Sequence, residues 1–380
     1  MPSRCFLGAV LALSLLSVPA FAAPYTLVFI GPATGTGSSS DAVSVNNAGQ
    51  VAGNDTDLSA TRGFVWQNGT VTPALLPSTI ANTTFVQGIN ASGQLAGYGR
   101  VAFGVDHAYR QTGNTILDLG DLPGGTNVSR GWGINANGWV VGESVTREGN
   151  VNALHGFVWN GSTMLDAGDL AGGANASTLT AINDSNVAVG WGSVAGSTRR
   201  AMKWENGVLT DLGEIPGGND LSQAQAINNA GVIVGESAIL GPANISVVRA
   251  VRWDGNGITE LGELPGGSDF STAYGINEAG DIVGRSRDST GDRAVLWRND
   301  VLIDLNDLVP DRGTFTMRTA YDINDLGWIV GSGFDSALDR NRAYVLIPEG
   351  TASETATPEP ASALLLVAGL AGLAIRRRTA

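Results

Sequence analysis

Residues 226–235 read AINNAGVIVG, and variants of this phrase occur seven times along the chain. Each copy has an aliphatic residue, an Asn, two further residues, a Gly or Asn, an apolar run and a second Gly. The repeated residues are separated by 44, 45, 48, 45, 49 and 47 positions and are Asn46, Asn90, Asn135, Asn183, Asn228, Asn277 and Asn324. One four-stranded blade of a β-propeller needs a repeat of this length. The sequence therefore predicts an all-β propeller.

The residues around each repeated Asn predict a tight hairpin between a first and a second strand. The third residue after the Asn is Gly in six copies and Asn186 in the fourth, and both types tolerate positive φ. The second Gly, four residues later, is interpreted as a bulge or a close backbone approach rather than a ligand contact. Small side chains two positions before the Asn place the first strand innermost; these residues are Ser44, Gly88, Gly133, Ala181, Ala226, Gly275 and Asp322.

The third and fourth strands have patterns of their own. The third reads basic, small, hydrophobic, any residue, Trp, as in Arg249–Trp253, and the fourth reads Leu-x-Asp-Leu-Gly, as in Leu209–Gly213. We expect the acid of the fourth strand to pair with the basic residue of the third, for example Glu260 with Arg249. The third strand resembles the HAF family of extracellular repeats, most closely at His107-Ala108-Tyr109 and His155-Gly156-Phe157. The resemblance covers about residues 25–347 and implies secretion and a repeat architecture, but no reaction.

The two ends of the repeat region indicate how the fold closes. The seventh repeat stops after its third strand, Arg342–Ile347, and an unassigned apolar run, Tyr25–Gly31, precedes the first repeat. That run aligns with a fourth strand and would complete the last blade, which leaves no exposed sheet edge. The predicted fold is a seven-bladed β-propeller closed by an N-terminal strand, with signal-peptide and C-terminal sorting helices. An open solenoid is the alternative.

The chain is predicted to have four parts. Residues 1–22 read as a signal peptide, with Arg4, an apolar core and Ala20-Phe21-Ala22 as a small-x-small cleavage site. The repeats occupy 23–348, an acidic linker 349–357 and a sorting segment 358–380.

The sorting segment combines an apolar stretch with polar residues at both ends, namely Pro358, Glu359, Pro360, Arg376, Arg377 and Arg378. It resembles the PEP-CTERM signal of Gram-negative bacteria. The resemblance implies processing by an exosortase, transient membrane contact through this segment, and export through the periplasm to the outer surface or beyond.

Composition and residue positions argue against several kinds of chemistry. The net charge of −13 disfavours nucleic acid or anionic lipid as a partner. Cys5, the single cysteine, lies in the signal peptide, and His107 and His155 occupy a slot that holds Arg in other repeats. We therefore expect neither a catalytic triad nor a cofactor. Ca²⁺ at the Asp-rich stretches 54–57, 288–292 and 335–339 is an alternative, although solvated turns are favoured because EF-hand spacing is missing.

The repeats differ most between their second and third strands, where function is expected. Extended loops are predicted at 143–153 and 236–248, beside a second-repeat loop on the same rim. The candidate binding residues of this rim are Tyr98, Arg100, Phe103, Asp106, Arg147 and Glu148. Trp132 and Trp139 flank the third hairpin and would either join the rim or belong to the core.

These observations favour a non-enzymatic surface or matrix protein that binds extracellular polysaccharide or a surface protein. The alternative is a glycan-cleaving enzyme that uses carboxylates in the central channel, with Asp322 as the one carboxylate at an otherwise small position. A purely structural repeat without a specific ligand is a third interpretation.

Overall fold

The computed structural model describes residues 25–31, 39–75, 83–102, 104–148, 151–173, 175–195, 197–241 and 246–349. Strands dominate these ranges, with one short 3-10 helix, η2 (Leu305–Leu308), after β25. Across the same ranges, no helix has the length and apolar character needed to span a membrane. The predicted signal peptide and sorting segment, with their helices, and nearly all of the linker lie outside the described residues.

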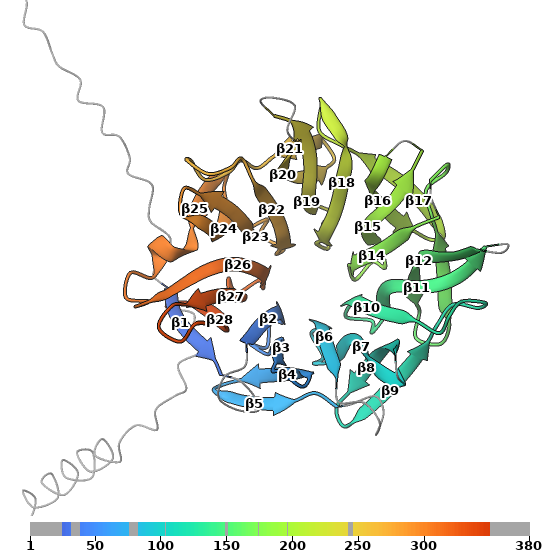
Figure 1. Cartoon of the computed structure of the whole chain (residues 1–380), viewed down its shortest axis with the longest axis horizontal. Helices are drawn as coiled ribbons and strands as arrows, with labels where there is room; N and C mark the ends of the chain where they lie inside the picture. The colour runs from blue at the N-terminus through green and yellow to red at the C-terminus, as the bar shows by residue number, and fades with distance from the viewer. Residues whose placement is uncertain are drawn as a thin grey trace, which may run out of the picture.

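The strands form antiparallel sheets arranged around a central axis (Figure 1). Each repeat supplies one unit of consecutive strands. The first three units are β2 (Ser39–Val45), β3 (Val51–Thr56), β4 (Thr61–Gln67) and β5 (Thr70–Pro73); β6 (Thr84–Ile89), β7 (Leu95–Ala102), β8 (Val105–Thr112) and β9 (Thr115–Gly120); and β10 (Ser129–Ile134), β11 (Val140–Glu148), β12 (Val151–Trp159) and β13 (Met164–Gly168).

The fourth and fifth units share one eight-stranded sheet, in which a single parallel pair, Arg199 with Leu221, joins them. Their strands are β14 (Ser177–Ile182), β15 (Ala188–Val194), β16 (Ser197–Glu205) and β17 (Val208–Gly213), then β18 (Gly218–Ile227), β19 (Ile233–Leu240), β20 (Ser246–Asp254) and β21 (Gly257–Glu260). The sixth unit contains β22 (Ser271–Ile276), β23 (Ile282–Asp288), β24 (Gly291–Arg298) and β25 (Val301–Asp304).

The last sheet combines the two ends of the repeat region. It consists of β26 (Phe315–Ile323), β27 (Ile329–Asp335), β28 (Arg340–Pro348) and the N-terminal β1 (Tyr25–Ile30). β1 pairs antiparallel with β28, from Tyr25 opposite Pro348 to Ile30 opposite Ala343. The N-terminal strand thus occupies the fourth-strand position that the sequence predicts for it. Among the described residues, no ladder merges all the sheets into one closed sheet.

The first strand of every unit lies nearest the axis (Figure 1), and its hairpin has the predicted geometry. The turn residue three positions after the repeated Asn has positive φ in all seven units, including Asn186 at +62°. Opposite the second Gly, each first strand contains a register shift, for example between Ala224 and Ala226. A Cβ on Gly235 would lie 2.0 Å from the Gln223 carbonyl oxygen. The second Gly is therefore required by close backbone packing at a bulge.

Hydrophobic clusters fill the spaces between neighbouring units. Between the fourth and fifth units, for example, Val189 packs with Ile227 and Trp253. The Trp of the third strand is almost fully buried wherever it occurs, at Trp66, Trp159, Trp204, Trp253 and Trp297.

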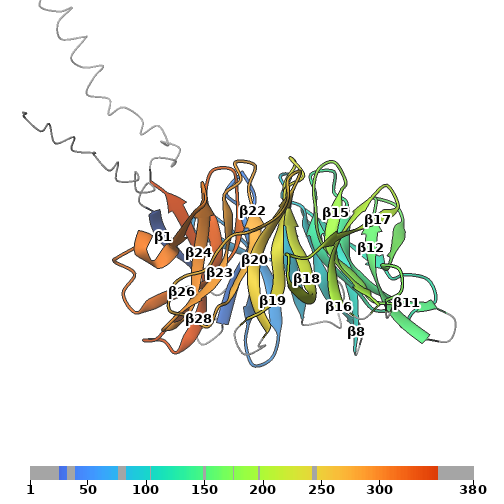
Figure 2. The same ribbon diagram turned by 90° about the horizontal axis from the view of Figure 1, so that it is seen from above.

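Two predicted loops are instead extended hairpins. β11 and β12 stay paired out to Glu148 and Val151, and β19 and β20 out to Leu240 and Ser246. Figure 2 shows the β11 hairpin projecting from the body of the molecule. The extra residues continue the ladder because they are mostly β-branched or alternate in polarity.

Candidate functional site

The central channel has two ends, and the first is bordered by the seven repeated Asn residues. Each Asn Nδ2 donates a hydrogen bond to the backbone oxygen of the corresponding Asn in the next unit, at 2.9–3.2 Å. Asn324 donates to Asn46, so the series returns to its start. Each Asn Oδ1 also accepts a hydrogen bond from the backbone N–H four residues on, as from Val232 to Asn228. We call this end the asparagine mouth.

Three carboxylates at the asparagine mouth also form hydrogen bonds between neighbouring units. Asp184 accepts the backbone N–H of Ala136, Glu278 accepts that of Asn229, and Asp325 accepts that of Glu278, at 2.8–2.9 Å. Each contact joins one unit to the next. The cavity here is about 210 Å³, and the side chains named above are used in contacts between units.

The other end of the channel contains a larger cavity of about 390 Å³ with a different lining. We call it the aromatic mouth; its lining residues are Asp41, Val43, Asn54, Thr56, Phe85, Gln87, Tyr98, Tyr274 and Tyr321. They come from the first, second, sixth and seventh units, which the ring brings together. All four aromatic side chains are only partly buried, so their ring surfaces are open to a ligand.

One side of the aromatic mouth is a stack of three rings. Phe85 and Tyr98 face each other across β6 and β7 with centroids 4.7 Å apart, and Trp132 of β10 meets Tyr98 edge-on at 5.6 Å. The Arg130 guanidinium lies over the Tyr98 ring at 5.6 Å. Offset and edge-on ring contacts of this kind are attractive, so the stack is held in place before any ligand arrives.

The opposite side is formed by Tyr274 and Tyr321, whose ring centroids are 5.8 Å apart. Burial raises the pKa of both hydroxyls, and of Tyr98. These three phenols therefore stay protonated at neutral pH and can both donate and accept hydrogen bonds.

Charged groups surround the rings. Arg130 donates to Glu143 at 3.1 Å and lies 3.7 Å from Asp106, which also contacts Arg100 at 3.3 Å. Glu236 accepts a hydrogen bond from Thr272 at 2.8 Å. Burial raises the pKa of Asp41 and of Glu236, although hydrogen bonds from Ser332 and Thr272 respectively oppose the rise. The aromatic mouth thus presents apolar ring surfaces beside hydrogen-bonding groups.

The predicted rim is only partly assembled. Tyr98 and Arg100 lie on β7 and Asp106 on β8, rather than on a loop, and all three belong to the aromatic mouth or its charged border. Arg147 is exposed near the far end of β11, where a Cβ on Gly124 would lie 3.4 Å from it. Glu148 ends β11, and Phe103 lies outside the described residues.

The two tryptophans have different positions. Trp139 packs against the core cluster that contains Val141 and Trp204, whereas Trp132 joins the ring stack. The sequence missed Phe85, Tyr274 and Tyr321. A signal was present: the residue three positions before the repeated Asn varies widely and is aromatic at Trp132, Tyr274 and Tyr321.

The recurring basic and acidic residues pair as a scaffold. His107 lies 2.9 Å from Asp118, His155 2.9 Å from Asp166, and Arg249 3.0 Å from Glu260. The two histidines thus take the place that Arg249 takes in the fifth unit and Arg293, 3.7 Å from Asp304, takes in the sixth.

Each Asp-rich stretch includes a turn, although residues 54–56 of the first belong to β3 and Asn54 and Asp55 are buried there. Asp57, Asp288 and Asp335 accept backbone N–H groups of their own turns and pair with Arg62, Arg293 and Arg342 at 2.9–3.0 Å. Within the described ranges, no three or more His, Cys, Asp or Glu residues are grouped so that they could hold a metal ion.

Asp322 is located where the seventh unit meets the first. Its carboxylate accepts hydrogen bonds from Ser44 Oγ at 3.0 Å and from the backbone N–H of Val45 and Ile323 at 2.9 Å. Burial raises its pKa to about 6, against the effect of these donors. Asp322 therefore fastens β26 to β2, and it is absent from the lining of the aromatic mouth.

Comparisons with solved structures find partial likenesses at low sequence identity. The β-propeller domain of the trilobed protease from Pyrococcus furiosus is 11% identical, with a TM-score of 0.49 over 69% of this chain and 80% of that one. The Aleuria aurantia lectin bound to Fucα1-6GlcNAc is 13% identical, with a TM-score of 0.40 over 69% and 92%. TolB from Acinetobacter baumannii is 11% identical, with a TM-score of 0.40 over 82% of this chain and 64% of that one.

None of the curated proteins matches this sequence. Residues 356–378, which lie outside the described ranges, match the family model of the PEP-CTERM protein-sorting motif. The motif implies that an exosortase processes the chain and that the protein is exported and sorted to the cell envelope or surface.

Proposed function

We propose that this protein is a HAF-type repeat protein of the cell surface or extracellular matrix that binds polysaccharide without cleaving it. In this proposal the units form a seven-bladed propeller, closed by β1, which displays the aromatic mouth as its binding site. Two observations support the closed ring. The hydrogen bonds of the asparagine mouth return from Asn324 to Asn46, and β1 is the fourth strand of the seventh unit. The sorting motif supports a location at the cell surface.

The observation that carries the proposal is the composition of the aromatic mouth. Rings such as Tyr98 and Tyr274 can pack against the apolar C–H face of a sugar ring, while Gln87 and the Tyr321 hydroxyl can form hydrogen bonds with its hydroxyl groups. Cavities that bind small molecules commonly combine apolar rings with a few polar groups in this way. A volume of about 390 Å³ lies within the usual range of about 300–1,000 Å³ for ligand pockets.

The experiment is an equilibrium binding assay of the purified exported protein with extracellular polysaccharide from a bacterium that has an exosortase. Saturable binding without release of sugar is the expected result. Binding that disappears in EDTA and returns with Ca²⁺ would add a bridging cation to the site. Lack of binding to the polysaccharide, with or without Ca²⁺, would contradict the proposal.

Glycan cleavage is the second candidate, because Asp41 and Glu236 have carboxyl groups whose pKa burial raises. General-acid catalysis of glycoside hydrolysis uses a carboxyl group with a raised pKa. The cleavage proposal predicts release of reducing sugar in the same assay, and loss of that release in Asp41→Asn or Glu236→Gln.

A further inference from the structure

β26 contains an irregularity beyond the bulge that all first strands share. Its register with β27 shifts between Met317 and Thr319, so Arg318 has no residue opposite it in the ladder. The Arg318 side chain is exposed. Bulges are over-represented at functional sites because they re-aim a side chain, and this one turns an arginine away from the regular pattern.

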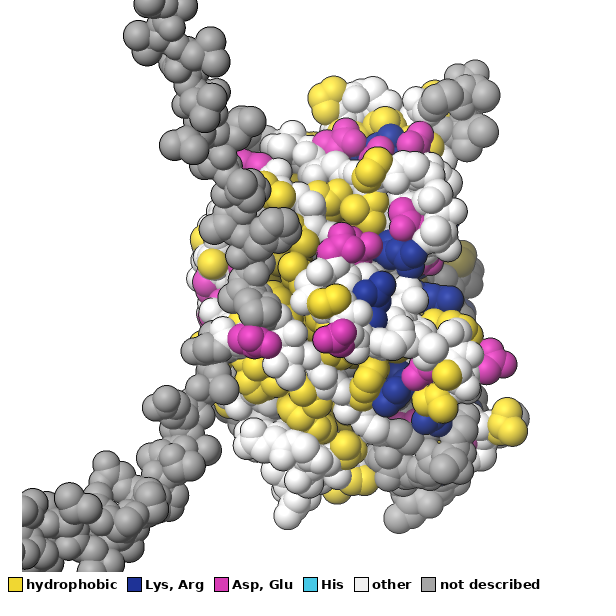
Figure 3. Space-filling view, turned by 90° about the vertical axis from the view of Figure 1, so that its left-hand side faces the viewer, with side chains coloured by type: hydrophobic (Ala, Val, Ile, Leu, Met, Phe, Trp, Pro, Cys, Tyr) yellow, Lys and Arg dark blue, Asp and Glu magenta, His cyan; other side chains and the backbone are white. Residues whose placement is uncertain are grey.

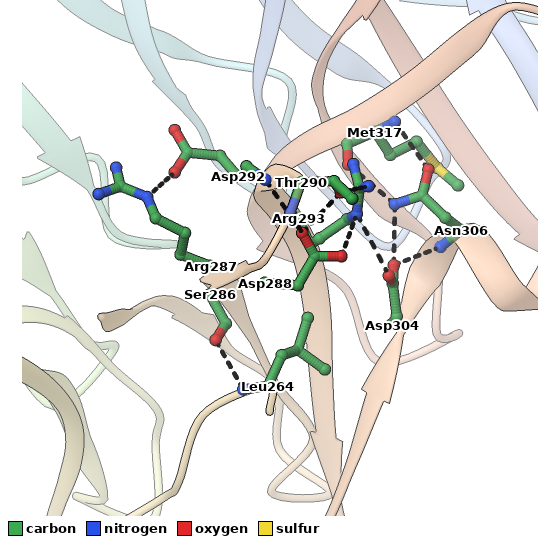
Figure 4. A network of polar contacts seen from close by, with 11 residues as sticks. Leu264, Ser286, Arg287, Asp288, Thr290, Asp292, Arg293, Asp304, Asn306 and Met317 are labelled. Carbon is green, nitrogen blue, oxygen red and sulfur yellow. Dashed lines mark hydrogen bonds and ion pairs between the residues drawn. The ribbon is translucent and has the colours of Figure 1, made fainter. Parts of the chain in front are cut away.

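Arg318 borders a cavity of about 300 Å³ between β26 and the turn that joins β23 to β24. The lining residues are Thr290, Gly291, Asp292, Arg293, Thr316 and Arg318. Figure 4 shows two of these residues, Thr290 and Arg293, both in contact with Asp288. We call this cavity the arginine cavity.

The other charged groups around the arginine cavity already have partners. Arg293 contacts Asp288 at 3.0 Å, and Asp292 is held by Arg287 at 2.9 Å (Figure 4). Arg285 also lies 3.5 Å from Asp292. Arg318 differs, because within the described part of the chain no carboxylate lies within ion-pair distance of it. Its guanidinium stacks on the ring of Phe334 at 4.4 Å, which orients it and leaves its N–H groups available.

The local charge is therefore unusual for this molecule. The side of the molecule drawn in Figure 3 shows basic side chains gathered in a band among scattered acidic ones. Around the arginine cavity, the guanidinium groups of Arg285, Arg287, Arg293 and Arg318 outnumber the three carboxylates that they contact. A chain with a net charge of −13 thus has a small region that favours an anion.

The arginine cavity and the aromatic mouth lie along one strand. Arg318 and Tyr321 are three residues apart on β26, a separation of about 10 Å along an extended strand. Arg285 lies between the two sites, since it contacts Asp292 and its charge also acts on Tyr274. A single oligosaccharide can therefore occupy both.

We infer that the arginine cavity binds the carboxylate of an acidic sugar residue in a polysaccharide whose neighbouring residues occupy the aromatic mouth. This inference rests on the proposed function and names its ligand class. A planar guanidinium donates two parallel hydrogen bonds to a carboxylate, and the hydroxyl group of Thr316 offers a further donor.

The test compares an oligogalacturonate with its methyl ester, which keeps the sugar rings and removes the negative charge. Arg318→Gln should weaken oligogalacturonate binding roughly 10- to 100-fold and leave binding of the ester unchanged. Arg318→Lys should retain part of the affinity. Arg252→Gln is the matched control, since Arg252 pairs with Asp254 in the fifth unit. This variant should bind both probes as the wild type does.

Two results would overturn the inference. The first is equal affinity of wild type and Arg318→Gln for oligogalacturonate; if Trp132→Ala then weakens binding of both probes, the proposed function stands and only the carboxylate site is wrong. The second is tighter binding of poly-aspartate than of oligogalacturonate at Arg318, which would assign the cavity to an acidic peptide. If the wild-type protein binds neither probe and no extracellular polysaccharide, both proposals fail together.

Discussion

The two mouths of the channel are built on the same first strands but use their residues differently. At the asparagine mouth, the same Asn occurs in every unit and its side-chain Nδ2 donates a hydrogen bond to the next unit. Towards the other end, the position three residues before the repeated Asn varies, and its side chain is partly exposed in every unit; the residues are Val43, Gln87, Trp132, Thr180, Gln225, Tyr274 and Tyr321. Residues that recur in all units thus maintain the ring, and residues that vary are free to specify a ligand.

The largest effect is expected from the Gly that faces the bulge. Gly235→Ala should lower the free energy of unfolding by about 4 kcal/mol, because its Cβ would lie 2.0 Å from a backbone oxygen and the strand cannot move away easily. Urea denaturation measures the change. Gly255→Ala is the control: no atom lies within 4 Å of its added Cβ, so a change below about 0.5 kcal/mol is expected. Equal stability of the two variants would refute the packing explanation.

The pH dependence of stability should come partly from Asp322. Burial raises its pKa to about 6 from 3.8, so the folded state binds the proton more tightly than the unfolded state does. The stabilisation from this proton is complete below about pH 4 and is lost as the pH rises through 6. Its loss lowers the free energy of unfolding by up to about 3 kcal/mol. Asp322→Asn removes the titration, so its unfolding free energy should fall less than that of the wild type between pH 4 and pH 7. Identical pH profiles would contradict this assignment.

Each repeated Asn of the asparagine mouth should contribute a smaller amount to the free energy of unfolding. Asn228→Ala removes the donor to Asn277 and leaves the N–H of Val232 without its acceptor, which should cost about 2 kcal/mol in unfolding free energy. Asn229→Ala, at the exposed neighbouring position, should cost less than about 1 kcal/mol. Thermal or urea unfolding of both variants compares them, and a larger loss in Asn229→Ala would show that the ring is not the main link between units.

Substitutions in the aromatic mouth should lower the affinity for polysaccharide. Tyr98→Ala removes the central ring of the stack and should weaken polysaccharide binding about tenfold. Tyr98→Phe keeps the ring and should retain most of the affinity. Equal affinity of Tyr98→Ala and the wild type, measured by calorimetry, would exclude this stack from the binding site.

The smallest effect concerns the pair on the third and fourth strands. A double-mutant cycle on Arg249 and Glu260 should give a coupling free energy of about 0.5 kcal/mol, because Glu260 is 44% exposed and solvent screens the pair. Denaturation of the two single variants and the double variant supplies the cycle. Zero coupling would remove this pair from the scaffold contacts.

Much of the fold was predictable because residues within each repeat determine the conformation of that repeat. The hairpin conformation follows from Asn and Gly at fixed positions, and Asn186 identifies the one exception. The aromatic mouth was less predictable, because Tyr321 and Phe85 come together only when the last unit lies beside the first. Likewise, a small-residue position does not reveal that Asp322 fastens β26 to β2, since its partners Ser44 and Val45 are 278 and 277 residues away in the sequence.

The most direct measurement compares polysaccharide binding by the wild type with binding by one variant at each mouth. Trp132→Ala changes the ring stack of the aromatic mouth, and Asn229→Ala changes an exposed residue of the asparagine mouth. If the aromatic mouth binds the ligand, Trp132→Ala should weaken binding about tenfold and Asn229→Ala should match the wild type. A loss confined to Asn229→Ala would place the ligand at the asparagine mouth and contradict the division of roles between the two ends.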